Sequence, residues 1–166
     1  VPTPFGLEVL VRAVRMACFG DAAPLTGVVV EHSGKRVSDR PRVLVVDAAP
    51  GFLEWAEMGL AHRGVTCFTT DNLMQALDLV ARENPGVVFM DIDMPGARAE
   101  QEIARFRERY PDGPPLYLMT GMPGGGAEPA GVAGVLHKPF ALDQMVGIVE
   151  TAAGARTNAV GSSAET

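Results

Sequence analysis

The stretch "VVFMDIDMPG" at residues 87–96 decides the fold of this 166-residue chain. Its first four residues form a continuous apolar run, which is typical of a β-strand buried on both faces of a sheet. The run ends at Asp91, and the Met-Pro-Gly that follows shortly after marks a turn. A buried strand that ends at a carboxylate predicts a parallel sheet with polar groups along the edge where its strands end.

The same alternation of apolar runs and helical patterns extends through residues 42–152. Short apolar runs predict four more strands, at residues 43–46, 65–68, 116–119 and 134–137. Helical patterns separate the strands: one from Pro50 to Gly64, one with Asp71 as its N-cap, a charged one with Ile103, Phe106 and Tyr110 on its inner face, and one at 142–152. This order predicts a doubly wound five-stranded parallel sheet of the α/β class, with helices on both faces.

Composition and charge exclude several kinds of partner. Twenty acidic residues against 14 basic ones give a net charge of −6, without a basic cluster. We therefore expect neither nucleic acid nor a membrane surface as a partner. The two cysteines lack metal-site spacing, which favours a reduced, cytoplasmic protein. No apolar run approaches the roughly 18 residues that a membrane-spanning helix needs.

Domain boundaries follow from the same patterns. We expect one domain at residues 41–153, preceded by a linker at residues 20–40. Residues 154–166 are rich in Gly, Ala, Ser and Thr, and predict a disordered tail. Residues 1–19 predict an additional N-terminal helix.

Four polar residues directly follow predicted strands: Asp47, Asp91, Thr120 and Lys138. Because ligands of such sheets bind where the strands end, we expect these side chains at one rim. Two carboxylates about 4 Å apart repel by about 4 kcal/mol at an effective dielectric of about 20, so a cation or lysine must offset them. Mg²⁺ binds through one or two carboxylates and phosphate oxygens. Together with a lysine and a hydroxyl, this set suits phosphoryl transfer, with an aspartate as the acceptor.

Four elements in this order, "VLVVD", "VVFMDIDMPG", "LYLMTG" and "HKPF", resemble the receiver domain of two-component response regulators. The resemblance covers the whole α/β pattern and implies a flavodoxin-like (βα)5 fold. It implies that Asp91 is the phosphoacceptor, that Thr120 is the switch hydroxyl and that Lys138 pairs with the phosphoryl group. It also implies Mg²⁺ at Asp47 and Asp91, with Asp93 at the position whose backbone carbonyl binds the metal.

The resemblance also implies partners. The phosphoryl donor would be a phosphohistidine on a sensor histidine kinase or a phosphotransfer protein. The chain itself would be no enzyme beyond self-catalysed acceptance and hydrolysis. Because no effector domain is recognisable after residue 153, we expect the output to come from a partner or from upstream domains. A homodimer through the output face or the N-terminal helix is a further expectation.

The chain departs from the family pattern in three regions. Ala48 replaces the second acid after the first strand, which should weaken Mg²⁺ binding, and the side chain of Asp93 would compensate in part. Val135 replaces a residue that is often aromatic in the family and that rotates inward as the threonine moves. We therefore do not expect that ring rotation here. The segment "GMPGGGAEPAG" at 121–131 is about one helical turn short and poor in helix formers, so a short or frayed fourth helix is expected.

The two ends of the chain carry a similar phrase. With Pro4 laid on Pro139, both contain Pro-Phe and then a leucine, two valines and an alanine at equal spacing. Residues 1–19 therefore resemble the end of a preceding receiver, with Thr3 in place of the lysine. The chain would then come from a tandem receiver or hybrid kinase, although any helix that starts with Pro-Phe would look alike.

Two other functions stay open at this point. A pseudo-receiver would bind proteins without phosphorylation, as Ala48, Val135 and the poor fourth helix would allow. A haloacid-dehalogenase-like phosphatase is a remote alternative, because "FMDID" resembles the Asp-x-Asp of that family. That family needs two more acids after the lysine strand, and only Asp143 and Glu150 lie there.

Overall fold

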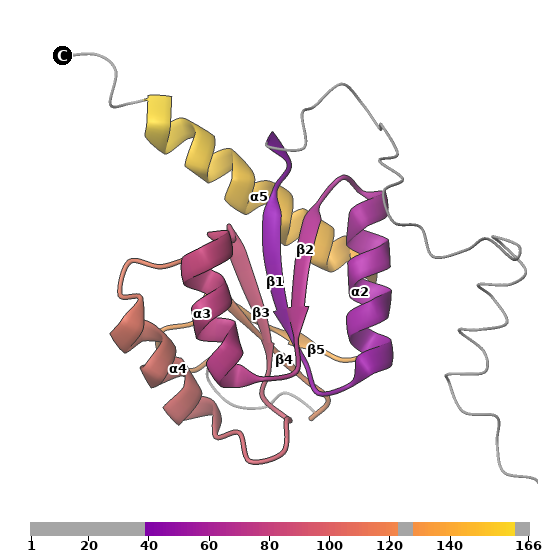
Figure 1. The fold of residues 1–166 in the computed structure, drawn as a ribbon, viewed down its shortest axis with the longest axis vertical. Helices are drawn as coiled ribbons and strands as arrows, with labels where there is room; N and C mark the ends of the chain where they lie inside the picture. The colour runs from indigo at the N-terminus through magenta and orange to yellow at the C-terminus, as the bar shows by residue number, and fades with distance from the viewer. Residues whose placement is uncertain (1–38, 123–127, 162–166) are drawn as a thin grey trace, which may run out of the picture. The chain divides into compact units, whose positions relative to one another are not determined.

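The computed structural model describes residues 39–122 and 128–161, with only the backbone for 157–161 (Figure 1). These residues form the predicted five-stranded parallel sheet and four helices. In chain order the elements are β1 (Arg42–Val46), α2 (Pro50–His62), β2 (Thr66–Thr70), α3 (Leu73–Glu83), β3 (Val87–Asp91), α4 (Ala99–Arg109), β4 (Leu116–Thr120), β5 (Gly134–His137) and α5 (Leu142–Gly161).

The strand order of the sheet is β2-β1-β3-β4-β5, and every neighbouring pair is parallel. This is the flavodoxin-like order. The sheet grows from β1 to β2 on one side and from β3 to β5 on the other, so the strand order reverses between β1 and β3. Val46 is opposite Met90 in the register of these two strands. Asp47 and Asp91 therefore follow as neighbours at the switch point, where ligands of such sheets bind.

The helices form a layer on each face of the sheet, with α2 and α5 on one face and α3 and α4 on the other (Figure 1). Alternate residues of the strands supply the two cores, as the two-residue period of a strand requires. Val43, Val45 and Phe89 pack toward α2 and α5. Leu44 and Met90 pack toward α3 and α4. The continuous apolar runs of the sequence are thus explained by burial on both faces.

The N-cap of α3 differs from the predicted one. The side chain of Asn72 accepts hydrogen bonds from the backbone amides of Met74 and Gln75, at 2.9 and 3.0 Å. The predicted cap, Asp71, precedes it and is exposed. The strand prediction ended at residue 68, whereas β2 continues to Thr70, and this extension moves the helix start along the chain.

Three other differences concern the connections and the ends. Helix α5 continues to Gly161, so residues 154–161 are helical where a disordered tail was predicted. Between β4 and β5, the described residues 121–122 and 128–133 contain no helix, in keeping with a poor fourth helix. The predicted N-terminal helix at 1–19 and nearly all of the predicted linker lie outside the described residues, as do residues 162–166.

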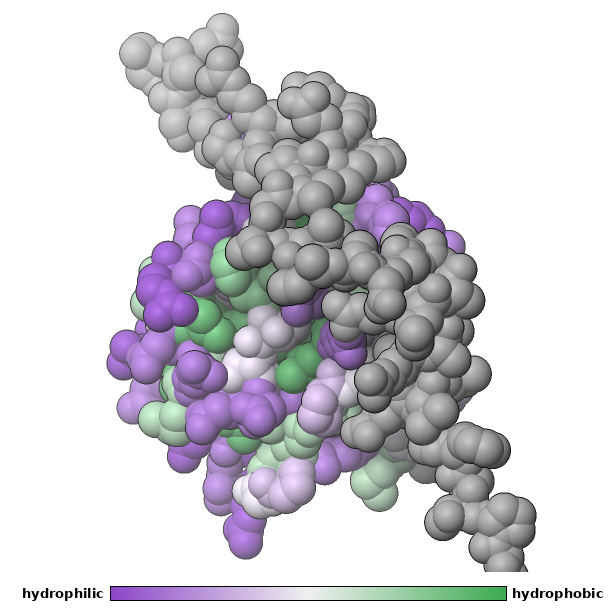
Figure 2. Space-filling model, turned by 45° about the vertical axis from the view of Figure 1, so that its right-hand side comes forward, coloured by the Kyte–Doolittle hydropathy of each residue, from purple (hydrophilic) through white to green (hydrophobic). Residues whose placement is uncertain are grey.

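Figure 2 shows one face of the described surface, on which hydrophobic residues form small patches between hydrophilic ones. Large exposed apolar side chains among the described residues are Trp55, Met58, Met74 and Met122. Trp55 is 39% exposed and packs against Phe52, with ring centroids 5.3 Å apart. It is therefore a partly buried packing residue. Among the helices in the described residues, none has the length and apolar character needed to cross a membrane.

Candidate functional site

Lys138 joins the two aspartates at the switch point. It follows β5, and its Nζ lies 2.5 Å from Asp47 Oδ2 and 3.1 Å from Asp91 Oδ2. Both aspartates are buried, with residue exposures of 1% and 6%. Its backbone amide donates to the carbonyl oxygen of Thr120 at 2.8 Å, which fixes the start of the turn beside β4. The predicted convergence of Asp47, Asp91 and Lys138 is present, and the lysine supplies the positive charge that two neighbouring carboxylates need.

The second oxygen of each aspartate is bound by the loop that follows its strand. Asp47 Oδ1 accepts from the amide of Ala49 at 2.8 Å. Asp91 Oδ1 accepts from the amide of Asp93 at 2.9 Å. Each carboxylate is thus held by a local backbone donor on one oxygen and by Lys138 on the other. This arrangement orients both carboxylates.

An aromatic ring covers the third side of the lysine. Lys138 Nζ lies 4.5 Å from the ring centroid of Phe52, within the range of a cation–π contact. Phe52 in turn packs edge-on against Phe140, whose centroid is 5.9 Å away. The sequence pattern by itself indicates only that Phe52 lies on the packing face of its helix. Its place in the first turn of α2, shortly after β1 and Asp47, is the signal that could have indicated a role at the rim.

The environment of Lys138 keeps it charged. Partial burial lowers the pKa of its ammonium group, whereas the hydrogen bonds and charges of Asp47 and then Asp91 raise it. The balance raises the pKa above its ordinary value. Lys138 therefore remains a cation throughout the neutral range.

The carboxylate of Asp93 binds the end of β4. Thr120 Oγ1 lies 3.1 Å from each of its oxygens and donates to them, and the amide of Gly121 donates to Oδ2 at 2.5 Å. Thr120 Oγ1 also accepts from the amide of Met122 at 3.1 Å. The structure thus brings Asp93 to Thr120 and does not group its side chain with those of Asp47 and Asp91. The predicted compensation for Ala48 by this carboxylate remains a prediction.

The carboxylates at the rim could bind a small hard cation, but only two of them are available as ligands. Within the described residues, no three side chains of His, Cys, Asp or Glu are grouped so that they could hold a metal ion. Asp47 and Asp91 lie together, and Mg²⁺ often uses only one or two carboxylates with water and substrate phosphate oxygens. The methyl group of Ala48 adds no ligand. The residues present therefore fit Mg²⁺ through two carboxylates.

Two further expectations concern residues of β5 and α5. Val135 is half-buried and packs against the core under α3 and α4, so no aromatic ring occupies its position. The acids that a phosphatase would need are exposed on α5. Of these, Asp143 pairs with Arg63 at 2.5 Å, and Glu150 lies two turns farther along the helix. They do not complete the site, so the phosphatase alternative lacks its residues.

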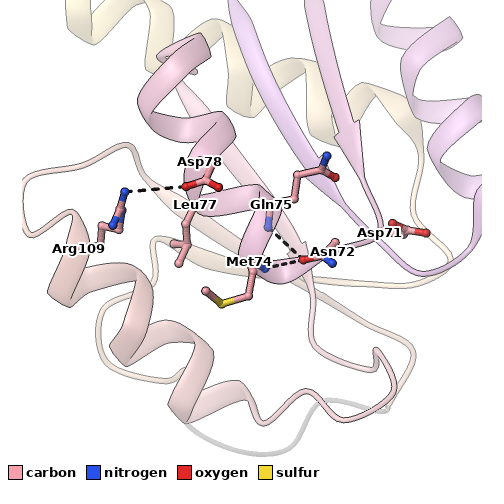
Figure 3. A pocket seen from close by; sticks show the side chains of 7 residues that line it. All are labelled: Asp71, Asn72, Met74, Gln75, Leu77, Asp78 and Arg109. Atoms are coloured by element: carbon pink, nitrogen blue, oxygen red, sulfur yellow. Dashed lines mark hydrogen bonds and ion pairs between the residues drawn. The ribbon is translucent and has the colours of Figure 1, made fainter.

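A shallow pocket of about 440 Å³ lies between the start of α3 and the end of α4 (Figure 3). It is lined by Asp71, Asn72, Met74, Gln75, Leu77, Asp78 and Arg109. Asn72 is engaged as the cap of α3, and the guanidinium of Arg109 lies 3.9 Å from a carboxylate oxygen of Asp78. None of Asp47, Asp91, Thr120 and Lys138 lines this hollow. The chemistry of the molecule is concentrated at the rim, not here.

Sequence comparison places the chain among known proteins. Residues 43–150 match the model of the response regulator receiver domain. The DNA-binding transcriptional regulator NtrC of Escherichia coli is 32% identical over 113 residues, covering 66% of this chain and 24% of NtrC. The probable transcriptional regulatory protein TcrX of Mycobacterium tuberculosis is 27% identical over 123 residues, covering 68% of this chain and 50% of TcrX. The chain thus spans about a quarter to a half of the length of these relatives.

Solved structures share the fold. A CheY-like response regulator receiver domain protein from Methanospirillum hungatei has a TM-score of 0.61 at 16% identity, over 72% of this chain and 98% of that one. A response regulator from Thermotoga maritima has a TM-score of 0.57 at 24% identity, over 69% and 98%. At these identities the likeness shows the fold alone, and the match over residues 43–150 identifies the family. The chain belongs to the response regulator receiver domains.

Proposed function

We propose that Asp91 accepts a phosphoryl group from a phosphohistidine in a His-to-Asp phosphorelay. One observation carries this proposal. Asp91 is buried at the switch point of the sheet, with one oxygen on the amide of Asp93 and the other on Lys138, beside Asp47. A carboxylate held in this way is oriented for attack, and a lysine within reach offsets the charge that the reaction brings.

A carboxylate oxygen of Asp91 attacks phosphorus and forms a P–O bond, while the P–N bond of the phosphohistidine breaks and its electron pair stays on the imidazole nitrogen. Lys138 donates hydrogen bonds to the phosphoryl oxygens as their charge approaches. Hydrolysis later adds water at phosphorus, releases inorganic phosphate and restores the carboxylate. The chain would thus act as a switch that accepts and hydrolyses a phosphoryl group on Asp91 and has no other substrate.

Asp47 and Asp91 would hold Mg²⁺ in this site. When bound, the ion would neutralise charge on the transferring phosphoryl group. Asp47 and Lys138 hold each other at rest, so Asp47 must exchange part of its contact with the ammonium for the ion. With Ala48 beside it, this site would bind the metal more weakly than one with two adjacent acids.

The partners follow from the chemistry. The donor would be a sensor histidine kinase or a phosphotransfer protein, and the reaction would take place in the cytoplasm. Phosphorylation replaces the single negative charge of the Asp91 carboxylate by a phosphoryl group that carries about −1.5 to −2, and it changes the hydrogen bonds of the surrounding loops. Those loops would carry the signal to a partner, to a second copy of the chain or to other parts of a longer protein.

A direct test uses an acyl phosphate as donor. The protein is incubated with Mg²⁺ and the donor, and its intact mass is followed, with Asp91→Asn as the control. We expect the gain of one phosphoryl group in the wild type and none in the control. A folded wild-type protein that gains nothing from the acyl phosphate or from a phosphohistidine donor would overturn the proposal.

That negative outcome would favour a second function, a pseudo-receiver that binds proteins without phosphorylation. Two observations favour it: Ala48 removes one acid, and Lys138 already occupies both remaining carboxylates. Mg²⁺ affinity, followed by the fluorescence of Trp55, separates the two functions. A phosphoacceptor must show a Mg²⁺-dependent change, and a pseudo-receiver needs none.

A further inference from the structure

Asp93 connects the acceptor aspartate to the end of β4. Its backbone amide donates to Asp91 Oδ1 at 2.9 Å, while its carboxylate accepts from Thr120 Oγ1 and from the amide of Gly121. The ladder between β3 and β4 ends just before these contacts, with the amide of Ile92 donating to the carbonyl of Met119 at 3.0 Å. One residue therefore touches both the proposed acceptor and the hydroxyl beside it.

The donors that Asp93 binds are the ones a phosphoryl group would need. A threonine hydroxyl has one proton to donate, and a backbone amide has one. The proton of Thr120 is shared between two carboxylate oxygens, and that of Gly121 is given to one of them. A phosphoryl group on Asp91 presents several acceptor oxygens. It can receive these hydrogen bonds only when Asp93 releases them.

Electrostatics adds to this competition. In the part of the chain that the structure describes, the ion pairs at the rim join Lys138 to Asp47 and Asp91, and no Lys or Arg forms one with Asp93. A phosphoryl charge on Asp91 would therefore repel the charge of Asp93, which no ion pair within the described residues neutralises. Asp93 is exposed, so its side chain has solvent into which it can turn. Release of the carboxylate needs no rearrangement of the core.

We propose that Asp93 is a positioning residue that holds Thr120 and Gly121 in place of the phosphoryl group. Phosphorylation of Asp91 displaces the Asp93 carboxylate from both donors, and the loop between β3 and α4 moves with it. Asp93 thereby sets the rate at which Asp91 accepts a phosphoryl group and the stability of the product. This inference rests on the proposed function, and it replaces a role for the Asp93 side chain as a metal ligand.

The test compares wild type with Asp93→Ala and Asp93→Asn. Asp112→Ala is a matched control, because it removes the same charge from an exposed turn after α4. Each protein is checked for folding by circular dichroism, and phosphorylation by an acyl phosphate with Mg²⁺ is followed by intact mass. Removing one charge-assisted hydrogen-bond acceptor should raise the initial rate about three- to tenfold in Asp93→Ala. Asp93→Asn keeps an acceptor oxygen and should give a smaller rise, and Asp112→Ala none.

Two further readouts separate positioning from a general structural role. The amide proton resonance of Gly121 should shift in Asp93→Ala, and in the wild type it should shift on phosphorylation, as the acceptor changes. Mg²⁺ affinity should be equal in wild type and Asp93→Ala. The Ala variant made in a Thr120→Val background should raise the rate less, because one of the two donors is already gone.

The outcomes are distinct. Faster phosphorylation of Asp93→Ala with unchanged Mg²⁺ affinity supports the inference. An equal or slower rate in the folded variant, while the wild type is phosphorylated, overturns the inference and leaves the proposed function standing. A clear loss of Mg²⁺ affinity in Asp93→Ala identifies a metal ligand and overturns it as well. If the wild type and both Asp93 variants all stay unmodified, the proposed function fails, and the inference fails with it.

Discussion

Asp91 has two flanks that are built differently. The lysine flank consists of Asp47, Lys138 and Phe52, where an ammonium is held by buried carboxylates and an aromatic ring. The threonine flank consists of Asp93, Thr120 and Gly121, in which an exposed carboxylate is held by a hydroxyl and an amide.

The two flanks differ in how readily their contacts can be exchanged. Buried charges on the lysine flank depend on each other, since removing one leaves another uncompensated. The threonine flank is held by hydrogen bonds whose acceptor can turn into water and be replaced. We infer that the lysine flank maintains the resting site and that the threonine flank is the part that changes.

The largest effect should come from Lys138→Met. It leaves Asp47 and Asp91 buried side by side without a cation, which we expect to lower the free energy of unfolding by about 2–4 kcal/mol, somewhat below a fully buried pair because the lysine is partly exposed. Urea unfolding followed by circular dichroism measures this. Adding Asp91→Asn should recover part of the loss, because it removes one of the repelling charges. A loss below about 1 kcal/mol would mean that the flank is not held by its charges.

Phe52→Leu tests the ring of the lysine flank. The variant keeps an apolar side chain but loses the cation–π contact with Lys138 and the ring contacts with Trp55 and Phe140. We expect a loss of about 1–2 kcal/mol in the free energy of unfolding. Phe52→Tyr keeps the ring and should lose little. If both variants lose equally, the contribution of Phe52 is packing volume and not its ring.

Thr120→Val measures the threonine flank. It removes the hydroxyl that donates to Asp93 and accepts from the amide of Met122, at almost unchanged volume. Because solvent can reach the loop groups left behind, we expect a loss of only about 0.5–1.5 kcal/mol. The same urea experiment gives the value. A loss equal to that of Lys138→Met would contradict the contrast between the flanks.

The sequence was sufficient for the positions of the rim residues. Each of Asp47, Asp91, Thr120 and Lys138 ends or follows an apolar run, and parallel strands bring their carboxyl ends to one edge. The architecture follows from the same runs, since only burial on both faces explains their lack of alternation.

The choice among nearby partners could not be predicted in the same way. From its place two residues after Asp91, the side chain of Asp93 could turn toward the proposed Mg²⁺ site or toward Thr120, and the pattern of residue types is the same for either orientation. The predicted cap of α3 was Asp71 and the observed one is Asn72. Both residue types cap helices well, and the end of β2 decides between them. The length of α5 was underestimated because its last turns carry no apolar periodicity, although alanine favours helix there.

The smallest effect should appear in alkaline solution, where Lys138 itself is the reporter. The chain has two lysines, Lys35 and Lys138, so few ammonium groups titrate in this range. The pKa of Lys138 is raised in the folded protein above the ordinary 10.5, because the contacts with Asp47 and Asp91 outweigh its partial burial. The unfolded chain therefore releases this proton first as the pH rises, and the folded protein binds the larger number of protons.

It follows that the stability contributed by the ion pairs is fully present below about pH 10 and declines as the pH rises through the folded pKa of Lys138. Urea unfolding of wild type and Lys138→Met between pH 7 and pH 11 measures it as the difference between the two proteins. That difference cancels the contributions of the other titratable groups, which both proteins share. We expect a constant difference up to about pH 10 and a narrowing above it. A narrowing that begins near neutral pH would mean that Lys138 is not held by the two carboxylates, and the lysine flank would then be no more permanent than the threonine flank.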